Sequence, residues 1–154
     1  MNQHSAHQST ERVGVLAWFA LAVIWLGGLT FYAAVVVPIG AAVTDSTTQG
    51  FITQRVTFWL NALGTAYVAL TWTDLRGGAG RGLQVTWCLV AIAQMALWLL
   101  HPVLDRMLDP DTLSISDAEN FYRWHRYYLL ATTIQWGAAV AHVGVRATHL
   151  LRQA

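Results

Sequence analysis

The stretch VGVLAWFALAVIWLGGLTFYAAVVVPIGAAVT, residues 13–44, decides the fold, because all 32 of its residues are uncharged. Three further uncharged stretches follow, at residues 56–73, 82–104 and 127–145. A bilayer core about 30 Å thick needs about 20 helical residues to cross it. The sequence therefore predicts an all-α fold, namely a polytopic membrane protein built as an antiparallel four-transmembrane-helix bundle.

The composition agrees with a membrane protein. Of the 154 residues, 55% are hydrophobic and only 11% are charged, whereas a soluble domain carries about 25% charged residues. The net charge of +1, with no basic stripe and no RNA-binding signature, predicts no nucleic-acid partner. The single cysteine, Cys88, can form neither an intramolecular disulfide nor a thiolate metal cluster.

The pattern divides the chain into a disordered polar tail at residues 1–12 and a transmembrane domain at residues 13–151. Pro38 is expected to end the first helix because proline lacks the N–H group that a helix needs. Ser116 and Glu119 have the spacing of a capping box and announce the last helix. The expected spans cover about residues 13–37, 52–73, 83–104 and 117–151, with the longest loop at residues 105–115.

Arginine distribution gives an expected orientation. Five arginines lie on the side that holds both termini and the turn at residues 74–82, and four lie on the other side. Positively charged flanks tend to stay in the cytoplasm. Both termini are therefore expected to be cytoplasmic.

Polar side chains recur at helical spacing inside the last span. Two sets repeat every seven residues: His125, Thr132, Ala139 and Arg146, and three positions further on Tyr128, Gln135, His142 and His149. The second and third spans carry similar seams. Because lipid offers no hydrogen-bond partner, these seams are expected to face the bundle interior. Hydrogen bonding between helices is a sufficient explanation for most of them.

One end of the expected bundle gathers candidate functional groups. His101 ends the third span and His125 begins the fourth, so an antiparallel pair of helices places them at similar depth. Tyr32 lies late in the first span, and two arginines stand at helix starts. The predicted ligand-binding residues are His101, His125, Tyr32, Arg55, Asn61, Gln94, Gln135 and Arg126.

Several chemistries could use this set. Two histidines on facing helices can ligate haem b, whereas a quinone suits aromatic walls with a few polar groups. A metal needs three or more ligands. His101, His125 and Asp105 show no recognised ligand spacing, so no metal site is assigned. No catalytic residue is assigned either. The first two turns of the last helix, with Asp117 and Glu119, are expected to protrude from the bilayer. No acidic residue is then expected within the membrane, which argues against proton-coupled transport.

Three stretches resemble small four-span bacterial inner-membrane proteins of uncharacterised function. They are GGLTFYAAVVVPIG at residues 27–40, QGFITQRVTFWLNALG at 49–64 and FYRWHRYYLLATTIQW at 121–136. The resemblance implies a multi-pass protein of the bacterial inner membrane. It implies no activity and no site residue.

Three functional hypotheses stay open. The first is an accessory or assembly subunit of a membrane complex, with a membrane-protein partner or a second copy of the chain on its lipid-facing surface. The second is a small redox protein that binds haem or quinone through His101 and His125. The third is a membrane enzyme acting on a lipid-soluble substrate, with His125 as general base and Arg55 or Arg126 holding an anion.

Overall fold

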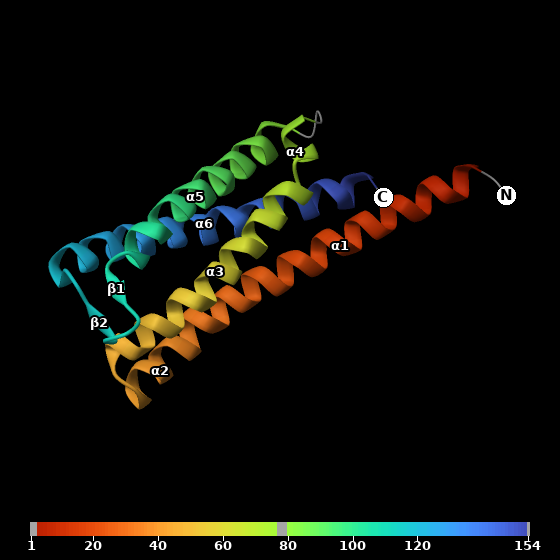
Figure 1. Cartoon of the computed structure of the whole chain (residues 1–154). Coiled ribbons are helices and arrows are strands. Elements are labelled where there is room, and N and C mark those ends of the chain that lie inside the picture. The colour runs from red at the N-terminus through yellow and green to blue at the C-terminus, as the bar shows by residue number, and fades with distance from the viewer. Residues whose placement is uncertain (1–2, 77–79, 154) are drawn as a thin grey trace.

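The computed structural model describes residues 3–76 and 80–153, with side chains described for 13–45, 47–75 and 80–152, and it is 87% helical. The all-α prediction is confirmed. Long helices run side by side, and the chain ends lie at the same end of the molecule (Figure 1). The elements are α1 Gln3–Phe31, η1 Tyr32–Val36, α2 Val37–Val43, α3 Ser46–Leu70, α4 Thr73–Arg76, α5 Arg81–Asp105, β1 Leu108–Asp109, β2 Ser114–Ile115 and α6 Ala118–Gln153.

The first long helix is longer at both ends than the sequence predicts. It begins at Gln3, inside the segment expected to be a disordered tail, because residues 3–12 contain no glycine or proline that would stop a helix from propagating. It also continues past Pro38 to Val43. A π-helical turn, in which Val37 N–H donates to the Tyr32 carbonyl, directly precedes the proline. Such a turn changes the hydrogen-bond spacing where proline interrupts it.

The turn between α2 and α3 is closed by side chains. Asp45 is the N-cap of α3, and its Oδ1 accepts hydrogen bonds from the backbone N–H groups of Thr47 (2.9 Å) and Thr48 (2.8 Å). Those donors have no partner within the helix. The two helices therefore meet in a short, well-defined corner.

The segment expected to be the longest loop contains a small antiparallel hairpin. Leu108 pairs with Ile115, and Asp109 pairs with Ser114. The predicted capping box at the start of α6 is wrong. Asp117 caps the helix, because its Oδ1 accepts from Asn120 N–H at 3.1 Å, while Ser116 Oγ instead donates to the Met107 carbonyl.

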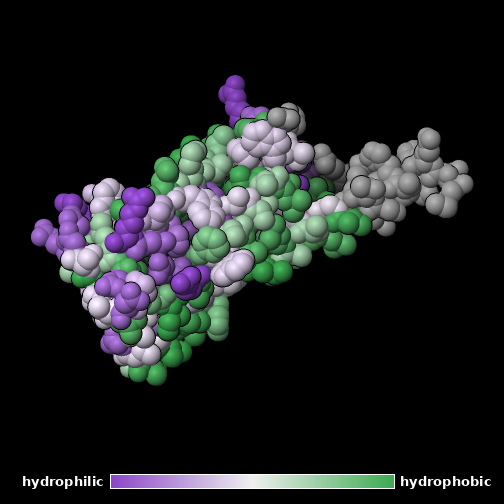
Figure 2. Space-filling model, viewed as in Figure 1, coloured by the Kyte–Doolittle hydropathy of each residue, from purple (hydrophilic) through white to green (hydrophobic). Residues whose placement is uncertain are grey.

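The seams of the last helix face inward as predicted. On α6, Tyr128, Gln135, Ala139 and His142 are buried, while Leu129, Leu130, Ile134 and Val140 are exposed. Figure 2 shows hydrophobic residues over much of the visible long-helix surface, and hydrophilic residues gathered at the hairpin end. The described part of the chain thus places polar groups in its interior and many apolar groups on its outside.

Two helical stretches are long and apolar enough to cross a membrane: Val13–Val43 and Arg81–Asp105. The sequence predicts four such spans. Within the described residues, α3 and α6 do not meet this criterion. Their inward-facing polar residues, such as Asn61 on α3 and His142 on α6, lower the average hydropathy of the helix as a whole.

Candidate functional site

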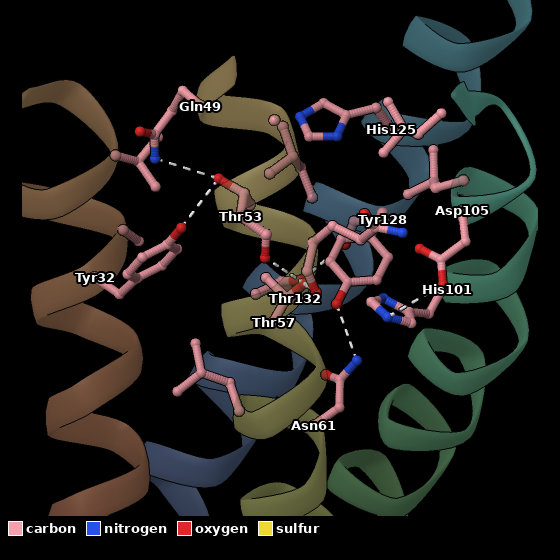
Figure 3. A pocket seen from close by; sticks show the side chains of 18 of the residues that line it. Tyr32, Gln49, Thr53, Thr57, Asn61, His101, Asp105, His125, Tyr128 and Thr132 are labelled. Carbon is pink, nitrogen blue, oxygen red and sulfur yellow. Dashed lines mark hydrogen bonds and ion pairs between the residues drawn. The ribbon is translucent and has the colours of Figure 1, made fainter. Parts of the chain in front are cut away.

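A partly open cavity lies between the long helices, at the end of the molecule that holds the hairpin. Its volume is about 410 Å³, and it is lined by the first helix, α3, α5, the hairpin strands and α6. Figure 3 shows the polar side chains of its walls pointing toward one another. The aromatic residues that line it are Trp25, Tyr32, Phe121, Tyr122 and Tyr128. Both the size and the aromatic lining are typical of sites for small organic molecules.

One wall of the cavity is built where the π-helical turn meets α3. Tyr32 donates from its hydroxyl to Thr53 Oγ1 at 3.0 Å, and Gln49 Nε2 lies 3.4 Å from the same oxygen. Gly40 permits this arrangement, because a Cβ there would lie 1.9 Å from Gln49 Oε1. Thr53 Oγ1 accepts both bonds and donates to no described residue. Its own hydrogen is therefore available to a ligand.

The opposite wall is formed by α5 and α6. His101 Nε2 lies 3.5 Å from Asp105 Oδ2, one helical turn further along α5. Tyr128 accepts a hydrogen bond from Asn61 Nδ2 at 3.0 Å, and its ring contacts that of His101. Asp105 Oδ1 is buried and has no hydrogen-bond partner among the described residues. This wall therefore holds a carboxyl–imidazole pair beside a phenol that is fixed in place.

His125 differs from the other polar residues of the cavity. Its ring stacks on Phe121 with centroids 5.8 Å apart and an interplanar angle of 13°. It lines the cavity but forms no hydrogen bond with any described residue. Phe121 thus fixes the plane of the imidazole while its nitrogens stay available. This is the arrangement expected of a group that hydrogen-bonds a ligand.

The structure brings five of the eight predicted residues to the cavity wall, namely Tyr32, Asn61, His101, His125 and Gln135. Gln94 lies next to them, since its Nε2 donates to the Asn61 carbonyl at 3.1 Å. Its Oε1 in turn accepts from Gln135 Nε2 at 2.6 Å. These three residues form a hydrogen-bonded amide layer across α3, α5 and α6.

The two predicted arginines lie elsewhere. Arg55 and Arg126 are exposed and do not line the cavity. Both stand close in sequence to lining residues, Gln54 and His125, but each residue along a helix is rotated by about 100° from the last. They therefore point to the outside, and the expectation that one of them holds an anion in the site is not met.

Several site residues were missed in the sequence. Gln49 and Thr53 stand one turn apart on α3, a spacing that could have marked a polar stripe reaching the cavity. Asp105 was considered only as a third metal ligand and was not assigned to the site; it lines the cavity and pairs with His101. Within the described residues, no group of three or more His, Cys, Asp or Glu side chains could hold a metal ion.

A second polar cluster, absent from the predicted site, lies at the other end of the molecule. His142 is fully buried. Its Nδ1 lies 2.7 Å from the Tyr67 hydroxyl, and its Nε2 lies 3.3 Å from Asp74 Oδ2. Arg146 pairs with the same carboxylate and lies over the Trp18 ring. Asp74 lies on the short helix α4 and is buried, so the segment expected to be a turn contributes a buried acid.

The two cavity histidines do not suit a shared haem iron. Tyr128, whose ring contacts that of His101, lies between the two imidazoles in Figure 3. His101 also turns its Nε2 to Asp105. The cavity is thus better suited to a ligand held by hydrogen bonds than to iron held by both imidazoles.

No family model, no curated protein and no solved structure matches this chain.

Proposed function

We propose that this chain is a four-span protein of the bacterial inner membrane that binds a neutral, lipid-soluble molecule of the quinone class. The first part of the proposal is that α3 and α6 also cross the bilayer. They have 25 and 36 residues, and about 1.5 Å of rise per residue makes each longer than a hydrocarbon core of about 30 Å.

The surface of these two helices supports this. On α3, the exposed residues include Ile52, Phe58, Trp59 and Leu70, whereas Asn61 is buried. A soluble monomer rarely exposes large contiguous apolar areas. The reverse distribution, with polar groups inside and apolar groups outside, fits a bundle surrounded by lipid. With both termini cytoplasmic, the cavity lies toward the opposite side of the membrane.

The charges of the cavity favour a neutral ligand. Among the described residues that line it, none is an arginine or lysine, so no cation is placed to bind a phosphate or carboxylate headgroup. Asp105 is the one acidic residue among the described lining residues, and it is paired with His101. Aromatic and aliphatic side chains form most of the remaining wall. A ligand that is apolar with a few hydrogen-bond acceptors matches this lining.

The positions of the free hydrogen-bonding groups favour a quinone. Thr53 has an available hydroxyl hydrogen on one wall, and His125 has an available imidazole on the other. A quinone ring carries carbonyl oxygens at opposite edges, and its flat faces can pack against aromatic side chains. The observation that carries the proposal is the unpartnered imidazole of His125, held in its plane by Phe121 at the cavity wall.

Binding of a benzoquinone to the detergent-purified protein, measured by isothermal titration calorimetry, tests the proposal. The wild type is expected to bind, and His125→Ala and Thr53→Val are each expected to weaken binding about tenfold, because each removes one hydrogen bond to the ligand. Arg126→Ala is the matched control, since Arg126 is adjacent to His125 and exposed. It is expected to bind like the wild type.

Three results would contradict the proposal. The first is a wild type that binds no quinone, and the second is a His125→Ala variant that binds as well as the wild type. The third is a Soret absorption band in protein from haem-replete cells that disappears in His125→Ala, which would assign the cavity to haem b. Docking on a larger membrane complex stays a prediction, and it is compatible with a bound quinone.

A further inference from the structure

A second hollow lies beside the cavity and opens on the outer surface between α1 and α6. This second hollow, here called the α1–α6 groove, has a volume of about 310 Å³. Its lining residues are Leu29, Thr30, Ala33, Ala34, Thr132, Thr133 and Trp136. Leu29, Ala33 and Thr132 also line the cavity. The groove therefore lies next to the proposed quinone site and shares these three wall residues with it.

The polar hydrogens of the groove are all used within the protein. Thr30 donates to the Leu26 carbonyl at 2.7 Å, Thr132 to the Tyr128 carbonyl at 2.9 Å and Thr133 to the Leu129 carbonyl at 2.9 Å. The Trp136 indole N–H is used as well, because it donates to Thr30 Oγ1 at 3.0 Å. The groove thus offers a ligand no free donor, in contrast to the cavity with its unpartnered His125.

Small side chains keep the groove open on the side of the first helix. Ala33 and Ala34 belong to the π-helical turn and are exposed. Trp136, on α6, reaches across to Thr30 on α1 through its hydrogen bond. The result is a hollow bounded by two helices, a tryptophan and two alanines, whose free surface is apolar.

We propose that the α1–α6 groove holds the hydrocarbon tail of the ligand and leads it from the cavity into the bilayer. The ligand class is then a quinone with a long alkyl or isoprenoid chain, with its ring in the cavity and its chain in the groove. This inference rests on the proposed function. It adds the route by which the ligand reaches the site, which runs laterally between α1 and α6.

The physical role of the groove is steric. A hydrocarbon chain gains little free energy on moving from lipid to an apolar groove, because lipid tails are as apolar as the side chains. A ring seated in the cavity nevertheless needs space for its chain to leave. Filling the groove should therefore exclude the chain and leave the site for the ring intact.

The test compares two probes, a dimethoxy-methyl-benzoquinone without a side chain and the same ring carrying a decyl chain. Ala34 lines the groove but not the cavity. Ala34→Trp is expected to weaken binding of the decyl probe by about tenfold, because the indole would occupy the space that the chain needs. Binding of the tailless probe is expected to stay unchanged. Ala20→Trp, at an exposed alanine of α1 outside the groove, is the matched control and should change neither.

A second variant protects the test against misfolding. Thr133→Trp fills the groove from α6 instead of α1, and Ala141→Trp, at an exposed alanine on α6, is its control. The inference is overturned if the decyl probe binds equally well to the wild type and to both filled variants. The groove would then be a site for surrounding lipid chains. A wild type that binds neither probe would instead refute the proposed function itself.

Discussion

At the scale of single residues, Gly64 sets how closely three helices approach. It is buried on α3, and a Cβ there would lie 2.2 Å from Gln94 Oε1 and 2.8 Å from Trp25 Cζ2. The contact with the Trp25 ring cannot be relieved by a small shift, because that side chain is itself buried. The amide layer formed by Asn61, Gln94 and Gln135 therefore depends on a residue without a side chain.

Replacement of Gly64 by alanine is expected to destabilise the protein by about 1–3 kcal/mol through overpacking. Gly137→Ala is the control, since a Cβ at Gly137 meets nothing within 4 Å and alanine has the higher helix propensity. Thermal unfolding in detergent measures both. A Gly64→Ala variant as stable as Gly137→Ala would show that the helices can separate at no cost.

At the scale of elements, the corner between α2 and α3 depends on the Asp45 cap. The backbone N–H and the hydroxyl of Thr48 bind the carboxylate and lower the pKa of Asp45 below its usual value, as does Thr47 N–H. The hairpin turn uses the same device, because Thr112 and the Asp111 N–H lower the pKa of Asp109. Both acids therefore hold their elements together most strongly in the charged form.

Because its folded-state pKa is lowered, Asp45 contributes stability above the ordinary carboxyl pKa of about 3.9, and this is lost as the pH falls through the lowered folded value. We expect Asp45→Asn to lower the melting temperature at pH 7. The difference from the wild type should shrink below about pH 4. Asp111→Asn is the control, since the Asp111 carboxylate bonds to no described residue. A pH-independent difference would contradict this account.

At the scale of the whole molecule, Asp74 joins the connection between α3 and α5 to the last helix, α6. Its carboxylate contacts both His142 and Arg146, and the side chains of Asp74 and Arg146 are only 9% and 16% exposed. The pair links residues 72 positions apart in the sequence. It fixes α6 against the short helix α4, at the end of the molecule opposite the cavity.

Asp74→Asn alone is expected to lower the free energy of unfolding by about 3 kcal/mol, because the mostly buried Arg146 loses its partner. Asp74→Asn combined with Arg146→Gln should recover a substantial part of that loss. Chemical denaturation of the two single variants and the double variant, analysed as a double-mutant cycle, measures the coupling. Additive effects would mean that the ion pair does not tie the two helices together.

The sequence by itself determined the helices, their order and their inward faces. The seven-residue repeat that runs from Tyr128 to His142 depends only on helical periodicity, and the buried residues of α6 follow it. The same local reasoning located His101 and His125 at one end. Whether all four long helices cross the membrane stays a prediction, since two meet the criterion of length and composition.

Only the tertiary structure decided which polar groups meet. Arg55 and Arg126 are exposed on the outside. Asp74 is buried and contacts His142. Thr53 accepts a hydrogen bond from Tyr32 on another helix. The π-helical turn before Pro38, which bounds both the cavity and the groove, also had no signal in the sequence. Periodicity fixes which side of a helix is buried, because it depends on neighbours a few residues away. Contacts between helices depend instead on their rotation and depth relative to one another, which are set only once all the helices have packed together.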